Sequence, residues 1–242
     1  MDDIGKQWYL IISDMHLKLW MITKAEEIME KRKLGGAVFL GDGADDFGQE
    51  RNTSLYNTCF YMIMSFMSKY ENSFFCIGNH EAAYLYNKQQ SGYSKYATMP
   101  MYANLLDMRR RFGNRVAFVH RLENVIFSHA GIIMQFIEQE MPELDAERDV
   151  DEIINRINDS GSRIWTYLSP IWARPSMYGY ESFNGSYLQV AGHTPVKEVK
   201  MVGNILLTDV FSTDGERPIG NEEFVVVNVY DKTYYTVPAK EV

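Results

Sequence analysis

The stretch WYLIISDMH (8–16) joins an apolar run to two side chains that can bind metal ions. Trp8 to Ser13 has the length and the continuous hydrophobicity of a strand buried on both faces. Asp14 and His16 follow directly. Residues two apart on an extended segment point the same way, so this pair can bind one metal ion. Alone the pair is weak evidence, because such residues also occur by chance or as helix caps.

Four later stretches repeat this arrangement of an apolar run followed by a possible metal ligand. They are FLGDG (39–43), CIGNHE (76–81), FSHAG (127–131) and VAGHT (190–194). The first and the last two would each be weak alone, because such residues are commonly turn, cap or hydrogen-bonded groups. The five stretches are far apart in the chain, so only folding can bring them together. We therefore predict one site at the strand ends of a sheet.

Hydrophobic patterning predicts alternating strands and helices in the first half of the chain. This alternation indicates an α/β fold with a largely parallel first sheet. The predicted segments are strand 8–13, helix 18–34, strand 37–40, helix 53–70, strand 73–77 and helices 81–90 and 101–112. The apolar stripe of the second helix, formed by Tyr56, Phe60, Met64 and Met67, is expected to pack in the core.

The second half of the chain is richer in strands. Turn signals at Gly203-Asn204 and Asp231-Lys232 predict two hairpins. The predicted strands are 115–120, 124–128, 187–191, 196–201, 205–209, 224–230 and 233–237. No repeat or linker divides the sequence, so residues 1–242 are expected to form a single domain.

Composition limits the classes of partner. The chain has 242 residues and a net charge of −8, which argues against a broad nucleic-acid or anionic membrane surface. No apolar run is long enough to cross a bilayer, so we expect a soluble protein. Cys59 and Cys76 are predicted to be buried and free, and the cytoplasm is the expected location.

The five stretches together supply two carboxylates, one amide oxygen and three imidazoles. These are too many ligands for a single tetrahedral zinc ion. They suit two metal ions roughly 3.5–4 Å apart, bridged by one carboxylate and by water. Such a pair activates the water and clamps a phosphoryl oxygen, as hydrolysis of a phosphate ester requires. The candidate ligands are Asp14, His16, Asp42, Asn79, His129 and His193.

In this order the motifs resemble those of the calcineurin-like metallophosphoesterases, and within them the phosphoprotein-phosphatase branch. The matching segments are Asp14-Met15-His16, Gly41-Asp42-Gly43-Ala44-Asp45, Gly78-Asn79-His80-Glu81, His129 in SHAG and His193 in GHTP. The resemblance extends over residues 8–210. The form GHTP resembles bacterial members, which include diadenosine tetraphosphate hydrolases and small protein phosphatases.

The resemblance implies a four-layer α-β-β-α sandwich of two mixed sheets flanked by helices. It implies that Asp14, His16 and Asp42 hold one metal ion. Asp42 would also bridge to a second ion held by Asn79, His129 and His193. We expect manganese, with iron or zinc as alternatives.

The resemblance also implies the catalytic roles. His80 would protonate the leaving oxygen and Asp45 would orient it, while a hydroxide that bridges the metals attacks in line without a covalent phosphoenzyme. Asn79 would contact substrate as well as metal. Glu81 is expected to support the turn rather than touch the substrate. His120 lies outside every motif and is expected to be structural.

One position departs from the family pattern. Asp46 stands where the family has an arginine that grips the substrate phosphate. Arg174 matches the position of a second phosphate-binding arginine in bacterial members and could take over this role, although it could also be an ordinary surface arginine. The basic run Arg109-Arg110-Arg111 is expected to be a solvated helix end.

These observations predict a hydrolase of phosphate monoesters, with a Ser/Thr phosphoprotein or a small phosphate ester as substrate. The first alternative is a hydrolase of dinucleoside polyphosphates such as diadenosine tetraphosphate. The second is a non-catalytic binding scaffold of the same fold, which is disfavoured because every ligand position, His80 and Asp45 are present. The oligomeric state is left open.

Overall fold

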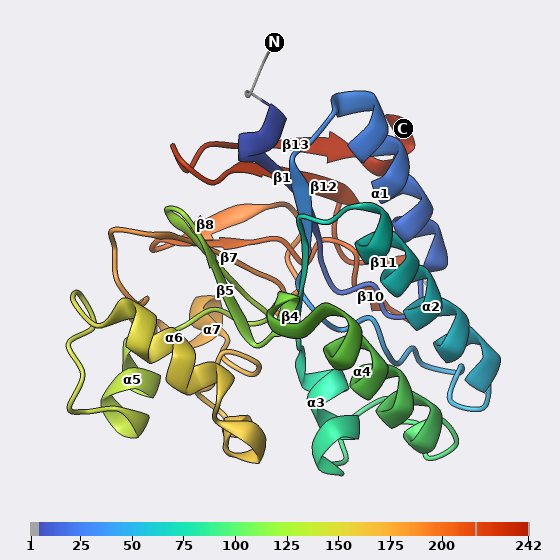
Figure 1. Ribbon diagram of the computed structural model, residues 1–242, viewed down its shortest axis with the longest axis horizontal. Coiled ribbons are helices and arrows are strands. Elements are labelled where there is room, and N and C mark those ends of the chain that lie inside the picture. Colours follow the sequence, from blue (N-terminus) through green and yellow to red (C-terminus); the bar gives the residue numbers. More distant parts are fainter. Residues whose placement is uncertain (1–4, 216, 242) are drawn as a thin grey trace.

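The computed structural model describes residues 5–215 and 217–241, and its largest element is a six-stranded mixed sheet (Figure 1). Strands β1 to β4 run parallel, while β12 is antiparallel to both β1 and β13. In spatial order the strands are β13 (Tyr234–Pro238), β12 (Glu223–Asn228), β1 (Trp8–Ile12), β2 (Gly36–Phe39), β3 (Ser73–Cys76) and β4 (Val116–Ala117).

A second mixed sheet has five strands. Its central strands β6, β7 and β9 are parallel, and an antiparallel strand lies at each edge. In spatial order the strands are β5 (Val119–Leu122), β6 (Val125–Ser128), β7 (Leu188–Ala191), β9 (Ile205–Leu207) and β8 (Lys200–Val202). A separate short hairpin is formed by β10 (Thr213–Asp214) and β11 (Arg217–Pro218).

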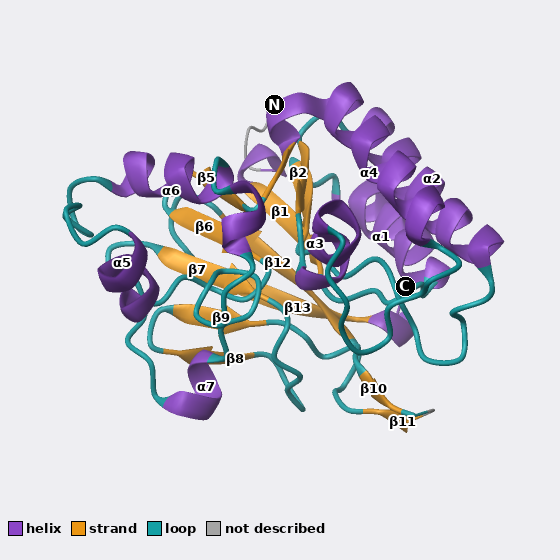
Figure 2. Cartoon of the chain, turned by 90° about the horizontal axis from the view of Figure 1, so that it is seen from below, coloured by secondary structure: helices purple, strands orange, loops and turns teal. Residues whose placement is uncertain are grey.

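Helices cover the outer sides of the two sheets (Figure 2). On the first sheet lie α1 (Leu19–Arg32), α2 (Thr53–Lys69) and α4 (Thr98–Phe112), while α3 (Asn79–Tyr86) follows the end of β3 and packs against α4. On the second lie α5 (Met134–Glu140), α6 (Val150–Asn158) and α7 (Pro175–Tyr178). Short 3-10 helices occupy Gly5–Gln7, Gly113–Arg115, Gly161–Ile164 and Ala239–Glu241. This arrangement confirms the predicted α-β-β-α order of layers.

Alternation along the strands separates the core into two parts. Phe39 and Phe75 face α2, where their rings lie 5.2 Å from Phe66 and 6.3 Å from Phe60. The residues that alternate with them fill the space between the sheets, because successive strand side chains point to opposite faces. The buried cluster between the sheets comprises Ile11, Val38, Leu40, Cys76, Val125, Phe127, Leu188, Val190, Leu206, Val225, Val227 and Val229.

The predicted single strand 115–120 is wrong, because the chain changes sheet within it. β4 pairs with β3 in the first sheet, and β5 pairs with β6 in the second. Between them, the side-chain oxygen of Asn158 accepts hydrogen bonds from the backbone N–H groups of Phe118 and Val119, at 3.0 and 2.9 Å. Asn158 thus satisfies backbone groups that leave one ladder before the other begins.

Other element boundaries differ less from the predictions. The strand predicted for 196–201 begins only at Lys200, and the turn at Gly203-Asn204 forms as expected. The helix predicted for 81–90 runs from Asn79 to Tyr86, so Gln90 lies in a loop. It ends there because Asn87 takes a left-handed conformation that caps the helix.

The cysteines, His120 and the basic run at the end of α4 have the structural roles expected of them. Cys59 and Cys76 are buried and free. His120 is buried and donates a hydrogen bond from Nε2 to the carbonyl of Phe75 at 3.1 Å, and burial lowers the pKa of its imidazole to about 4. Arg110 and Arg111 lie in the last turn of α4 and pair with Asp107. None of the helices described is long and apolar enough to cross a membrane.

The packing between the sheets generates a stability prediction. Replacing Leu206 with Ala should lower the free energy of unfolding by about 2–5 kcal/mol, because it opens a cavity in the buried layer. Its cross-strand neighbour Met201 is 43% exposed, so Met201→Ala should cost less than about 1 kcal/mol. Urea denaturation measures both. Equal losses would contradict the location of this core.

Candidate metal centre and active site

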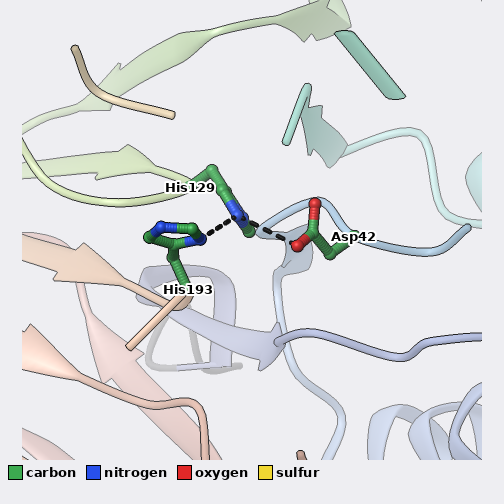
Figure 3. Close-up of side chains that lie close together, drawn as sticks. All are labelled: Asp42, His129 and His193. Carbon is green, nitrogen blue, oxygen red and sulfur yellow. Dashed lines mark hydrogen bonds and ion pairs between the residues drawn. The ribbon is translucent and has the colours of Figure 1, made fainter. Parts of the chain in front are cut away.

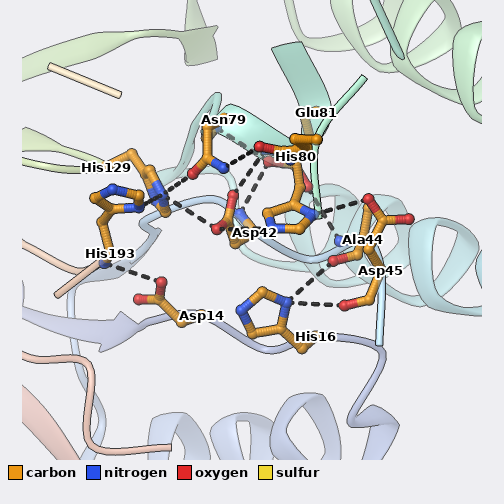
Figure 4. A network of polar contacts seen from close by, with 12 residues as sticks. Asp14, His16, Asp42, Ala44, Asp45, Asn79, His80, Glu81, His129 and His193 are labelled. Carbon is orange, nitrogen blue, oxygen red and sulfur yellow. Dashed lines mark hydrogen bonds and ion pairs between the residues drawn. The ribbon is translucent and has the colours of Figure 1, made fainter. Parts of the chain in front are cut away.

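The candidate ligands lie where parallel strands of both sheets end (Figure 4). Asp14, Asp42 and Asn79 follow β1, β2 and β3 of the first sheet. His129 and His193 follow β6 and β7 of the second. Carboxyl ends of parallel strands share one edge of a sheet, and here the edges of both sheets meet. The predicted convergence of the five motifs is therefore present.

Several of these residues adopt a backbone conformation that is rare outside glycine. A positive φ costs a residue with a side chain roughly 1 kcal/mol or more and persists only where the surroundings enforce it. Such residues cluster at functional sites, and here they turn the chain after β1, β2 and β7. The residues are Asp14 (φ 43°), His16 (44°), Asp42 (51°), Asp45 (63°) and His193 (62°).

Backbone carbonyls fix the orientation of two of the imidazoles. The Nδ1 of His16 donates to the carbonyl oxygen of Asp45 at 2.8 Å, and the Nδ1 of His129 donates to that of Leu40 at 2.8 Å. A carbonyl can only accept, so each Nδ1 carries a proton. The opposite Nε2 of each ring is therefore the atom available to a metal ion, as is usual for metal-binding histidines.

One group of candidate ligands surrounds the Nε2 of His129 (Figure 3). This atom lies 3.2 Å from an oxygen of Asp42, 3.1 Å from Nδ1 of His193 and 2.8 Å from Oδ1 of Asn79. A single proton on Nε2 cannot satisfy three acceptors at once. A divalent cation can be shared by all four donor atoms, so this set of nitrogen and oxygen donors fits a metal ion.

A second group consists of Asp14, His16 and Asp42, so the two groups share Asp42. Asp14 is held by the hydroxyl of Ser13 and by the backbone N–H of His193, which donates to its Oδ1 at 2.9 Å. Five of the six residues predicted as ligands belong to these two groups. The sixth, Asn79, adjoins the first group through its contact with His129. Two neighbouring groups that share one carboxylate fit a pair of metal ions.

Burial makes these side chains costly without a cation. Burial raises the pKa of Asp14 well above its ordinary value. Burial also lowers the pKa of His16 to about 4 and that of His193 far below its usual range, so both imidazoles are neutral, as ligands must be. Burial would raise the pKa of Asp42 too, but the imidazoles of His129 and His80 lower it more.

His80 belongs to neither metal group and is paired with Asp45, as predicted. Its Nδ1 donates to Oδ2 of Asp45 at 2.8 Å, while its Nε2 lies 3.8 Å from Oδ2 of Asp42. The other oxygen of Asp45 accepts hydrogen bonds from the hydroxyls of Tyr56, at 3.0 Å, and Tyr84. Burial opposes a charge on His80, but Asp42 and Asp45 raise its pKa to about 9.

Glu81 holds two of the motif loops together, as predicted. Its carboxylate accepts hydrogen bonds from the backbone N–H groups of Asp42, Gly43 and Ala44 after β2, at 2.9, 2.9 and 3.1 Å. It also accepts one from Gly78 after β3, at 3.0 Å. Glu81 is completely buried and has no surface for a substrate. Its role is to fix Asp42 relative to Asn79 and His80.

A cavity of about 270 Å³ opens over the ligands. Arg174 lines it and donates from Nη1 to the backbone carbonyl of His193 at 2.8 Å. Asp46 also lines it. The cavity wall further includes Phe47, Trp172 and the side chain of Lys18.

Comparison with known protein families shows to which family the chain belongs. The sequence profile of the calcineurin-like phosphoesterases matches residues 8–197. The chain belongs to this family. The family depends on two metal ions, and this chain supplies two adjoining groups of candidate ligands. Comparison with curated proteins gives no match.

Solved structures of similar fold are distant from this phosphoesterase in sequence. An archaeal phosphodiesterase is 14% identical, with 95% of this chain and 98% of that chain covered and a TM-score of 0.42. A metallophosphoesterase from Sphaerobacter thermophilus is 14% identical, with 96% of this chain and 88% of that chain covered and a TM-score of 0.42. A phosphoesterase from E. coli is 13% identical, with 96% of this chain and 99% of that chain covered and a TM-score of 0.37. The family assignment rests on the sequence match.

Sequence reasoning missed several side chains of this phosphoesterase site. Gln90 accepts a hydrogen bond at 2.6 Å from Nδ2 of Asn79, which directs Oδ1 of Asn79 toward His129. Tyr56 is a core residue, as predicted, but its hydroxyl also donates a hydrogen bond to Asp45. Asp209, two residues beyond β9, lines the cavity, and burial raises its pKa to about 6. Its place after an apolar strand resembles that of the ligands and could have signalled it.

The shared carboxylate generates a metal-binding prediction for this phosphoesterase. Elemental analysis of protein purified without chelator should find about two divalent ions per chain. Asp14→Asn should retain about one, because it weakens only one group, whereas Asp42→Asn should lose both. Asp107→Asn, in α4 and outside both ligand groups, is the matched control and should keep both. Equal stoichiometry in the Asp14 and Asp42 variants would contradict the bridging position.

Proposed function

We propose that this phosphoesterase hydrolyses phosphate monoesters, either of a Ser/Thr phosphoprotein or of a small molecule, with the aid of two divalent metal ions. The observation that carries the proposal is the pair formed by the partly buried His80 and the buried Asp45, beside but outside the two ligand groups. A charged imidazole next to a metal pair provides the proton that the leaving oxygen of an ester requires. This function would place the chain in the phosphoprotein-phosphatase branch.

We assign Asp14, His16 and Asp42 to one metal ion, and Asp42, Asn79, His129 and His193 to the other. Two such ions, when bound, neutralise the phosphate and activate water for in-line attack. The mixed nitrogen and oxygen donors favour manganese, with iron or zinc as alternatives. The protein's part is to hold the ligands rigidly, through Glu81 and the backbone contacts of the imidazoles.

His80 would act as the proton donor. Asp45 fixes its Nδ1, so the proton on Nε2 is the one that can leave. The two tyrosine hydroxyls on the far oxygen of Asp45 keep this carboxylate in place. Once the proton is transferred, the neutral ring remains held by the same contact and can be protonated again. A non-catalytic scaffold would have no use for this arrangement.

Arg174 and Asn79 would hold the phosphate. Arg174 uses one N–H on the carbonyl of His193, which positions the guanidinium at the cavity wall and leaves other donors for a substrate. Asn79 lies at the cavity wall with its amide fixed by Gln90. Asp46 would repel an anion rather than bind it, so the grip on phosphate must come from other residues.

A second candidate function is hydrolysis of a dinucleoside polyphosphate. The observation in its favour is Phe47, which lines the cavity with its side chain 73% exposed and could stack on a base. In either case the partner would be a phosphorylated substrate. Two buried thiols with no disulfide fit the cytoplasm, where we propose that the protein acts.

The proposed role of His80 generates a kinetic prediction. His80→Ala should lower turnover of alkyl esters such as phosphoserine by about 10²–10⁴-fold, because their leaving oxygens need a proton. Turnover of p-nitrophenyl phosphate, whose leaving group needs none, should fall less than tenfold. Wild-type turnover of alkyl esters should decline as pH rises through about 9, where the imidazole loses its proton. Unchanged metal content is the control, and equal losses on both esters would remove His80 from this role.

The substrate class is tested by direct comparison. With Mn²⁺ present, we expect kcat/KM for a phosphoserine peptide or a small monoester to exceed that for diadenosine tetraphosphate. Phe47→Ala should then change monoester turnover little, because the ring lies at the edge of the site. A clear preference for the dinucleotide, lost in Phe47→Ala, would instead establish the second candidate.

A further inference from the structure

Lys18 is a cation of the cavity that none of the motifs includes. It lies directly before α1 and lines the same cavity as the ligands and Arg174. Its ammonium nitrogen is buried and has no hydrogen-bond partner within the part of the chain that the structure describes. An ammonium group has three donors, and burying them unpaired is unfavourable. The site therefore has a cation whose donors are not used by the protein.

The position of Lys18 relative to the metal ligands is fixed by the backbone. The N–H of His16 donates to the carbonyl of Asp42 at 2.8 Å, and that of Leu17 donates to Gly43 at 3.0 Å. Leu17 itself has a positive φ of 61°, which turns the chain into α1. These contacts tie the segment that carries Lys18 to the loop that carries Asp42. The backbone of Lys18 is thereby held close to the candidate metal groups.

Acidic side chains surround the ammonium but do not pair with it. The charges of Asp46, Asp209 and Asp14 act on it from beyond hydrogen-bond distance. Burial lowers the pKa of the Lys18 ammonium, and these negative charges partly oppose that decrease without using its donors. Arg174, in contrast, already gives one donor to the backbone of His193. Lys18 is thus a cation at the cavity wall whose ammonium donates no hydrogen bond to the described residues.

We propose that Lys18 binds a phosphate oxygen of the substrate and makes the enzyme prefer monoesters to diesters. This inference rests on the proposed function. A monoester carries a charge near −2 at neutral pH and three non-bridging oxygens, whereas a diester carries −1 and two. A further buried cation with three free donors adds most to the binding of the group that has the extra charge and the extra oxygen.

The test compares Lys18→Met and Lys18→Gln with wild type, all loaded with Mn²⁺. Binding of inorganic phosphate, measured by calorimetry, should weaken about tenfold or more in both variants. The kcat/KM for p-nitrophenyl phosphate should fall similarly, while that for bis(p-nitrophenyl) phosphate should change less than threefold. Lys18→Arg should recover part of the loss. Lys31→Met, at an exposed lysine of α1, is the matched control.

Different failures can be told apart. Equal losses on the monoester and the diester, or unchanged phosphate binding in both variants, would overturn the role of Lys18 while leaving the proposed function intact. A wild-type protein that hydrolyses neither ester would overturn the proposed function, and the calorimetric comparison would still decide whether Lys18 binds phosphate. A wild-type protein that does not bind phosphate would overturn the inference. Metal content and the unfolding midpoint of each variant show whether it is folded.

Discussion

The buried carboxylate of Glu81 accepts hydrogen bonds from four backbone N–H groups in two loops, and the geometry of the site depends on it. These loops carry Asp42, Asn79 and His80, three of the side chains closest to the proposed chemistry. Their backbones could not satisfy one another, because both present donors. A buried acid between them solves this problem, and removing it would leave four donors unpaired in the protein interior. Glycine at position 78 completes the contact, since a Cβ there would collide with the carboxylate of Asp42.

The electrostatics of the site have a simple origin. Asp14, Asp42, Asp45 and Asp209 are all buried within a few residues of strand ends, in a chain that is already acidic. Different neighbouring groups offset the cost of burying each carboxylate. Asp45 pairs with His80 and accepts hydrogen bonds from two tyrosine hydroxyls, whereas Asp42 lies beside His129 and His80, which lower its pKa. Asp14 accepts hydrogen bonds from Ser13 and the backbone of His193, and Asp209 accepts them from Ser212. Metal ions reverse this balance because they bring positive charge to a place where carboxylates and neutral imidazoles are ready to bind it.

The sequence predicted the fold and the candidate ligands because both depend on local patterns. Asp14, Asp42, Asn79, His129 and His193 each follow a short apolar run, so their place at strand ends was readable without tertiary information. Tyr84, Gln90 and Lys18 lie in no such pattern. Tyr84 reaches Asp45 from α3, and Gln90 reaches Asn79 from the loop beyond that helix, so only the path of the folded chain brings them in. The division of residues 115–120 between two sheets was hidden for a similar reason. Continuous hydrophobicity does not distinguish one strand from two that meet at Asn158.

The shared position of Asp42 has a consequence for the order of assembly. Asp14, His16 and Asp42 all come from the first sheet and its loops, whereas His129 and His193 come from the second. One ion would therefore bind within a single half of the molecule, and the other would act as a cross-link between the halves. The two affinities should respond differently to any motion that separates the sheets. Loss of that ion would remove one connection between the sheets, while the apolar layer between them and the ligands of the first ion would remain in place.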